Sequence, residues 1–252
     1  MRPYRYVQIL LAATSIFLMI FLKSWWAAII PAFLLLLALA AGAVFIRLNF
    51  FLTALHHGDR SSRHIALTFD DGPAAFTGEI LDILQSEQVQ AAFFTIGERA
   101  AANPLLVRRW ADEGHIIGNH SYHHGFWFDM LPTRKVLMEI NATNAAIKTI
   151  SGREPRLFRP PYGVTNPAIA RAVGTAKIMA IGWSLRSFDT KAKSPEALVR
   201  KIMAQLKGGD VILLHDSMAV TAAALTPLIK AARAKGFTFV RLDQLLNIQP
   251  YA

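Results

Sequence analysis

The chain has 252 residues, of which 53% are apolar, and a formal charge of +10 at pH 7. The apolar excess lies before residue 50, so the composition excludes a uniformly soluble chain. The basic residues form no stripe with interleaved aromatic side chains, so we expect no nucleic-acid partner and attribute the charge to attraction for anionic lipid headgroups.

Two apolar runs open the chain. Residues 7–22 contain three polar side chains, and residues 25–46 contain no charged one. As helices the runs would be about 24 and 33 Å long, against a hydrocarbon core of about 30 Å, which makes the second run the stronger candidate for a membrane span. The first resembles the core of a signal peptide, but no small-residue cleavage site follows it. We therefore expect a transmembrane helical hairpin over residues 1–50, with Lys23 and Ser24 at its turn; a hairpin buried in a soluble domain is the alternative.

The charge pattern around the hairpin bears on its orientation. Both ends of a hairpin lie on the same side of the membrane, and Lys and Arg are enriched on the cytoplasmic side. Only Lys23 lies in the turn, whereas five arginines lie near the two ends, which favours a cytoplasmic C-terminal domain. These are Arg2, Arg5, Arg47, Arg60 and Arg63. We expect a multi-pass protein of the inner or cytoplasmic membrane with two helices.

After a tether at residues 51–63, β-rich runs alternate with helix-period segments over residues 64–252. This alternation predicts parallel strands joined by crossover helices. Strands are expected at His64–Asp70, Ala91–Gly97, His115–Ser121, Arg156–Pro160, Ala176–Leu185, Val211–His215 and Thr238–Leu242. Helices are expected at Gly78–Glu87, Pro104–Glu113, Thr133–Ile150, Pro195–Leu206 and Thr221–Lys235. The predicted fold is a distorted (β/α)7-8 barrel, with an open doubly wound sheet as the alternative.

Polar side chains lie at the carboxyl ends of these strands. Asp70 and Asp71 end the first strand, His120 ends the third, Arg159 the fourth and His215 the sixth. Folds with parallel strands gather their active sites at this edge. We therefore expect these side chains to form one site.

Asp70 and Asp71 are adjacent carboxylates, so they point in different directions, and one can bind a cation while the other faces substrate or water. Alone, Asp-Asp-Gly is typical of an ordinary solvated turn. His120 and His124 can share a face if their segment turns helically. Two imidazoles and a carboxylate form a common divalent-metal set with positions left open for water and substrate. His123 leaves the choice of imidazoles open.

A bound cation would lower the pKa of its water from about 15.7 towards 7 and polarise an acyl oxygen. Hydrolysis then needs a base and an acid. Asp70 is the expected base, and Arg159 is expected to keep it ionised, because a nearby cation lowers the pKa of a carboxylate. His215, which ends a buried strand, is the expected acid for a leaving amine. A purely structural histidine is the alternative.

Four segments in chain order resemble motifs of the polysaccharide deacetylases, carbohydrate esterase family 4. The NodB-homology domain of that family would cover roughly residues 62–245. The segments are Thr68-Phe69-Asp70-Asp71-Gly72-Pro73, His120-Ser121-x-x-His124, Arg159-Pro160-Pro161-Tyr162-Gly163 and Leu213-Leu214-His215. Each could arise by chance, but four in order are highly specific.

The resemblance implies a role for each matching residue in the first two motifs. Asp70 would be the catalytic base. Asp71, His120 and His124 would bind a divalent metal, with His123 outside the triad. Zn²⁺ is the expected ion, and Co²⁺, Ni²⁺ and Mn²⁺ are alternatives.

The other two motifs imply residues that position the reacting groups. Arg159 would orient Asp70, and the backbone N–H of Tyr162 would help stabilise the oxyanion. His215 would be the acid, beneath an apolar wall at Leu213 that receives the acyl methyl group.

The fourth motif of the family departs from its usual pattern in residues 183–190, Trp-Ser-Leu-Arg-Ser-Phe-Asp-Thr. Asp189 matches the second aspartate and would orient His215 and tune its charge. Arg186 stands where the first acid is expected, and Thr190 where a tryptophan would wall the pocket. An arginine here favours an anionic group, such as the phosphate of a lipid-linked sugar.

We expect a metal-dependent hydrolase that removes N-acetyl groups from amino-sugar glycans: peptidoglycan, chitooligosaccharide-like chains or exopolysaccharide. One alternative is a deacylase or deformylase of a polyprenyl-phosphate-linked amino sugar. Another is an inactive membrane-tethered carbohydrate-binding protein. The expected partners are the glycan or lipid-linked sugar and membrane lipid, and no obligatory protein partner is indicated. Family habit places such domains on the outer face, against the charge bias.

Overall fold

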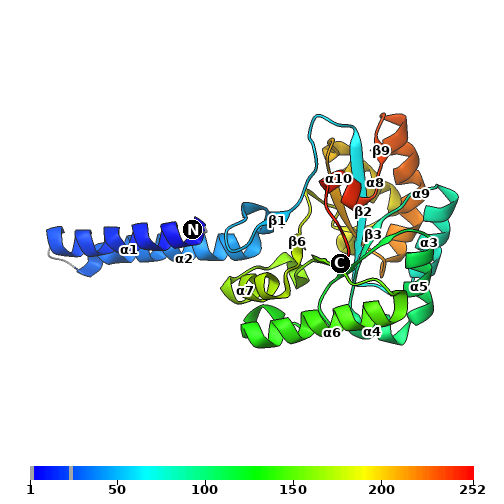
Figure 1. The fold of residues 1–252 in the computed structure, drawn as a ribbon. Coiled ribbons are helices and arrows are strands. Elements are labelled where there is room, and N and C mark those ends of the chain that lie inside the picture. The colour runs from blue at the N-terminus through cyan, green and yellow to red at the C-terminus, as the bar shows by residue number, and fades with distance from the viewer. Residues whose placement is uncertain (1–2, 23–24) are drawn as a thin grey trace.

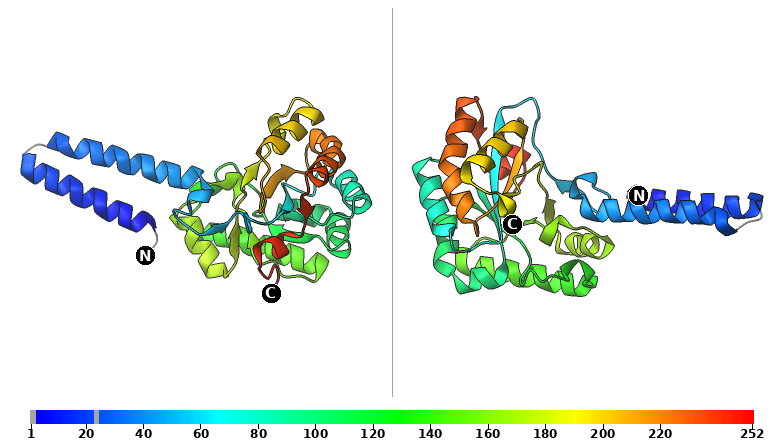
Figure 2. Two further views of the ribbon diagram at one scale, coloured as in Figure 1. Left: turned by 90° about the horizontal axis from the view of Figure 1, so that it is seen from above. Right: turned by 180° about the vertical axis from the view of Figure 1, so that it is seen from behind.

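The computed structural model describes residues 3–22 and 25–252 and has two unlike parts (Figure 1). Two helices lie side by side and antiparallel, and they project from an α/β domain that contains the rest of the chain (Figure 2). The chain ends in this domain, whose strands are drawn from cyan to red in Figure 1.

The projecting pair consists of α1 (Pro3–Leu22) and α2 (Ile29–Val44), with the short helix η1 (Trp25–Ala28) before α2. Of the helices described, only α1 is long and apolar enough to cross a membrane, and none of its span is buried. The second apolar run was expected to be the stronger candidate for a membrane span, and this expectation was wrong. The short helix η1 takes the start of that run, so α2 has 16 residues and spans about 24 Å. The exposed face of α1 also argues against a hairpin buried in a soluble domain. The expected turn, Lys23 and Ser24, lies outside the described residues.

The domain is built on one curled sheet whose strands pair in parallel. Hydrogen bonds join them in the order β1-β6-β5-β4-β3-β2-β8-β7, and β9 pairs with β2. The strands are β1 (Ala54–Leu55), β2 (His64–Asp70), β3 (Ala92–Thr95), β4 (Ile116–Asn119), β5 (Leu157–Phe158), β6 (Met179–Ile181), β7 (Leu185–Arg186), β8 (Val211–His215) and β9 (Thr238–Phe239). Across the described ranges β1 and β7 form no pair, so the sheet is a curled half-barrel and not a closed barrel.

Helices connect the strands (Figure 1). They are α3 (Thr77–Ser86), α4 (Gly97–Ala102), α5 (Pro104–Asp112), α6 (Thr133–Ser151), α7 (Pro167–Ala176), α8 (Pro195–Gln205), α9 (Ala219–Ala234) and α10 (Leu242–Leu246). Of these, α3, α5, α8 and α9 cover one face of the sheet. The expected strands and helices are present, but α7 was not predicted, although its start has a sequence signal. Asn166 caps it by accepting a hydrogen bond from the backbone N–H of Ile169, and Pro167 occupies its first turn.

The expected strand Ala176–Leu185 is divided in the structure. It becomes the end of α7, then β6 and, after a break at residues 182–184, β7. Arg159 lies at this break, and its guanidinium donates to the carbonyl oxygens of Ile181 and Gly182 at 3.4 and 2.9 Å. β6 pairs with β1 and β5, whereas β7 pairs with β8 at the other end of the strand order, so the chain leaves one part of the sheet and enters another here.

Residues 51–63, expected as a tether, pack on the domain. Phe51 and Leu52 are buried, β1 pairs with β6, and the guanidinium of Arg60 forms an ion pair with Asp210. The projecting helices are therefore joined to the domain by a packed segment.

Alternate residues of the strands face two different apolar clusters. Ile65, Leu67 and Phe69 of β2 pack against α3, α5 and α9, whereas Ala66 belongs to the cluster on the other face. Since side chains alternate along a strand, Asp70 faces the same side as Ala66. His215 likewise shares a face with Leu213, so the strand period puts both on the concave side.

Candidate active site

The site lies at the carboxyl edge of the sheet, where strands distant in sequence are neighbours. β2 and β8 pair in the register that places Asp70 opposite His215. His120 follows β4 directly, and Arg159 follows β5. The fold thus brings these four side chains to one rim.

Arg159 is fully buried and links several parts of this rim. Its Nη1 donates to Asp70 Oδ1 at 2.7 Å and to Thr68 Oγ1 at 2.8 Å, and its guanidinium carbon lies 4.1 Å from the ring centroid of Phe94. Burial lowers the pKa of Arg159, and the nearby charge of Asp70 opposes this. A buried charge is tolerated only when it is paired and hydrogen-bonded, so Arg159 and Asp70 depend on each other.

Asp71, His120 and His124 offer three ligand atoms within 4.8 Å of one another. Asp71 Oδ1 lies 3.6 Å from Nε2 of each histidine. Ligands about 2.0–2.2 Å from a tetrahedral ion lie about 3.3–3.6 Å apart, so both distances from Asp71 match those expected around a divalent metal such as Zn²⁺. Asp70 Oδ2 lies 3.8 Å from His120 Nε2, which places the expected base beside the metal set.

A hydrogen bond to the backbone fixes the orientation of the His120 ring. Its Nδ1 lies 2.7 Å from the carbonyl oxygen of Arg159, which can only accept, so Nδ1 carries a proton and Nε2 is the atom that faces Asp71. His124 is affected chiefly by its surroundings. Burial, and then the neighbouring His120, lower its pKa to about 4. At neutral pH it therefore has the uncharged form that binds metal.

The segment between the two histidine ligands is not the helical turn that was considered. Ser121 and His124 adopt φ values of 67° and 50°, a left-handed conformation that is uncommon for residues other than glycine. These two residues bend the loop so that the rings meet. His123 points elsewhere, since its Nδ1 lies 2.7 Å from Glu139 Oε1 and its side chain is exposed.

His215 is oriented by Asp189. The carboxylate accepts from His215 Nδ1 at 2.8 Å and from its backbone N–H at 2.7 Å, and Thr221 donates a further bond. Burial disfavours the imidazolium, but the hydrogen bond and charge of Asp189 outweigh it and raise the pKa of His215 to about 9. His215 is thus protonated at neutral pH, as a general acid requires.

The remaining expected residues lie around this centre. The ring of Tyr162 is half exposed and meets His124 edge-on at 4.8 Å, with a backbone φ of 59°. Leu213 is buried in β8, opposite Arg186 of β7. The guanidinium of Arg186 is exposed and lies over the ring of Trp183 at 5.7 Å.

Asp216 and Trp183 were missed as site residues. Asp216 is buried, accepts a hydrogen bond from Thr77, and has its pKa raised to about 7 by burial, with Asp71 adding to the effect. A Cβ atom on Gly72 would collide with it, so Asp216 supports the backbone that carries Asp71. The sequence signal that could have identified Asp216 is its position as a charged residue next to His215. No such signal marked Trp183.

Comparisons with known proteins point to one family. Residues 57–181 match the family model described as polysaccharide deacetylase. The Bc1960 peptidoglycan N-acetylglucosamine deacetylase superposes with a TM-score of 0.75 at 30% identity, covering 79% of this chain and 95% of that one. The chain belongs to the polysaccharide deacetylase family.

Two relatives of this polysaccharide deacetylase domain differ in the sugar that they are named for. The chain is 35% identical over 187 residues to the peptidoglycan-N-acetylglucosamine deacetylase PgdA of Listeria monocytogenes, and the match covers 74% of this chain and 39% of that protein. It is 35% identical over 192 residues to the peptidoglycan-N-acetylmuramic acid deacetylase PdaC of Bacillus subtilis, covering 76% and 40%. The chain therefore spans about two fifths of the length of these two relatives.

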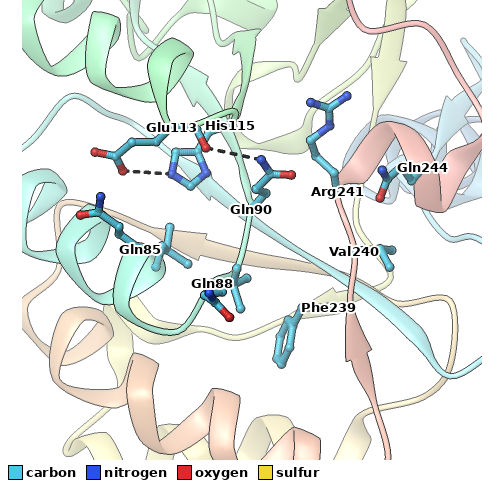
Figure 3. A pocket seen from close by; sticks show the side chains of 11 residues that line it. Gln85, Gln88, Gln90, Glu113, His115, Phe239, Val240, Arg241 and Gln244 are labelled. Carbon is cyan, nitrogen blue, oxygen red and sulfur yellow. Dashed lines mark hydrogen bonds and ion pairs between the residues drawn. The ribbon is translucent and has the colours of Figure 1, made fainter.

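A separate pocket of about 380 Å³ lies at the opposite end of the strands, before β3 and β4 (Figure 3). Glu113 and His115 point toward one another there, with 3.6 Å between Oε2 and Nε2, and Arg241 lies across the pocket. Neither of those two atoms has a hydrogen-bond partner among the residues described. Burial is the main reason why the pKa of His115 is lowered to about 4. In barrels of this kind this end contributes to stability, whereas catalysis occurs at the other.

Metal binding is the first testable consequence. We expect the purified chain to retain one Zn²⁺ after dialysis, and His120→Ala or His124→Ala to weaken binding by about 100-fold or more, because each removes a ligand. Elemental analysis and titration against a chromophoric chelator measure this. His123→Ala is the matched control and should bind as the unaltered chain does. Equal retention by all four proteins would contradict the assignment.

His115 gives a prediction about stability. Its folded pKa lies below that of the unfolded chain, so the unfolded state binds more protons between pH 4 and 6.5, and stability falls as the pH drops through this window. From pH 7 to 4.5 the loss is about 2 kcal/mol, or about 4–8 °C in Tm for a domain of this size. Thermal melts in detergent should show a smaller decrease for His115→Gln. An identical decrease in both proteins would refute this role.

Proposed function

We propose that this protein is a metal-dependent hydrolase that removes N-acetyl groups from amino-sugar glycans, peptidoglycan foremost. The observation that carries the proposal is the meeting of three units on one rim: Asp70 with its arginine, the Asp71 metal set, and His215 with its aspartate. Relatives named for peptidoglycan N-deacetylation support the substrate class.

Each residue has a distinct part in the proposed reaction. When bound, the metal polarises the acyl oxygen and makes water a better nucleophile. Asp70, hydrogen-bonded to the Arg159 guanidinium, accepts the proton of the attacking water. His215 then donates a proton to the leaving amine, and because Asp189 accepts from Nδ1, the transferable proton is the one on Nε2.

Two further residues shape the transition state in this proposal. The backbone N–H of Tyr162 helps to stabilise the oxyanion, since a preorganised donor is worth more where charge develops. Leu213, buried beside the histidine end of β8, provides the apolar wall for the acetyl methyl group. Catalysis then depends on hydrogen-bonded groups whose positions are fixed before substrate arrives.

The substrate alternative that we retain is a polyprenyl-phosphate-linked amino sugar. It is favoured by Arg186, an exposed cation at a position where the family motif has an acid. The inactive carbohydrate-binding alternative is disfavoured, because a protein that only binds glycan has no need of a paired base, a metal set and a tuned acid.

We propose the following organisation for the chain. Residues 1–50 form a membrane hairpin of two helices, residues 51–63 join it to the domain, and residues 64–252 form the NodB-homology domain. Action on peptidoglycan requires the domain to lie outside the cytoplasmic membrane, against the arginine bias at the hairpin ends. A reporter fused after Ala252 distinguishes the two orientations.

Asp70→Asn tests the proposed base. The change keeps the shape of the side chain and removes its basicity, so acetate release from N-acetylated peptidoglycan fragments should fall about 10²–10⁴-fold. Asp82→Asn, which alters an exposed carboxylate on α3, is the control and should retain activity. A chelator should stop release, and added Zn²⁺ should restore it. Full activity of Asp70→Asn would refute the mechanism.

Asp189→Asn tests the proposed acid through its pKa. Loss of the carboxylate removes the interaction that raises the pKa of His215, so the protonated form is lost at a lower pH. The alkaline limb of kcat/KM should therefore move down by about one pH unit or more. Profiles between pH 6 and 10 measure this. An unchanged alkaline limb would exclude His215 as the acid.

A further inference from the structure

A pocket of about 250 Å³ lies where the projecting helices meet the domain. One wall is the end of α2 and the short helix η2 (Ile46–Leu48), and the other is the segment from Trp183 to Phe188. Its lining includes Arg47 and Arg186 and, in the described structure, no carboxylate. The pocket is therefore positively charged.

Both guanidiniums are available to an anion. Nη1 of Arg47 donates to the carbonyl oxygen of Ser184 at 3.1 Å, which leaves its other N–H groups. Arg186 lies between the rings of Trp183 and Phe188, at 5.7 and 5.0 Å from their centroids. Neither arginine forms an ion pair with any residue described. Paired arginines on aromatic walls are a preferred arrangement for binding phosphate.

The pocket also marks the change from apolar to cationic side chains along the chain. Val44 and Phe45, at the end of α2, are 60% and 59% exposed, and Arg47 follows them after the buried residue Ile46. If the hairpin lies in a membrane, this change falls where hydrocarbon gives way to the phosphate layer. The arginines would then lie at the depth of the lipid phosphates, with apolar side chains beside the acyl chains.

A single indole separates this pocket from the active site. Trp183 has Arg186 on one side, and its ring centroid lies 5.8 Å from the guanidinium carbon of Arg159. Its ring tip also fills the space in which a Cβ of Gly163 would lie, next to Tyr162. A group bound in the pocket is thus held close to the rim where the proposed chemistry occurs.

We propose that this pocket binds the phosphate group of a membrane lipid through Arg47 and Arg186. Binding would hold the rim of the active site at the membrane surface and direct it to acylated sugars presented there. The consequence for substrate presentation rests on the proposed deacetylase function, whereas the binding itself requires neither metal nor catalysis.

The test uses the full chain in an uncharged detergent, titrated with phosphatidylglycerol, with phosphatidylcholine and with inorganic phosphate, and bound lipid is counted by native mass spectrometry. We expect one phosphatidylglycerol site, about tenfold tighter than any phosphatidylcholine site, because only the first lipid carries a net negative charge. Arg47→Gln and Arg186→Gln should each weaken it by about tenfold. Arg108→Gln, an exposed arginine on α5, is the matched control and should bind as the unaltered chain does.

Two results would overturn the proposal. One is equal phosphatidylglycerol affinity of the unaltered chain and both pocket variants, with thermal melts showing that all are folded. The other is displacement of the lipid by an equal concentration of inorganic phosphate, which would identify a site for the free ion. Asp70→Asn should lose acetate release and keep lipid binding, so a failure of one proposal is distinguishable from a failure of the other.

Discussion

The buried guanidinium of Arg159 is the interaction on which the site depends. It pairs with Asp70 at the end of β2, and its backbone carbonyl accepts the Nδ1 proton of His120 after β4. One residue therefore fixes the expected base and the direction of a metal ligand. A cation with no exposure to water cannot remain unpaired, so the same constraint that stabilises this part of the fold also determines the geometry of its chemistry.

The influence of Arg159 extends towards the projecting helices. Its guanidinium donates to the carbonyl oxygens of Ile181 and Gly182 at the end of β6, and the chain then continues through Trp183. The segment from Trp183 to Phe188, with Arg186 in it, forms one wall of the pocket against η2. The hydrogen bonds that order the active site thus also shape the junction with the projecting helices.

Local patterns in the sequence were sufficient for much of this account. β-rich runs predicted β2 and β8 with the observed ends, and Asp-Asp after one strand with His after another predicted a shared rim. The features that the sequence did not predict are set by tertiary contacts. The break between β6 and β7 follows from their pairing with different parts of the sheet, and the meeting of His120 with His124 depends on left-handed residues that no helical period reveals. The short sheet contacts of residues 54–55 were likewise hidden, because two residues carry no period.

The central claim is that Asp71, His120 and His124 share one ion, and X-ray absorption at the zinc edge of the loaded chain tests it most directly. The account predicts a first shell of nitrogen and oxygen at about 2.0–2.1 Å, with outer scattering from two imidazoles that decreases to that of one imidazole in His124→Ala. A spectrum without imidazole scattering, or one unchanged in His124→Ala, would contradict it.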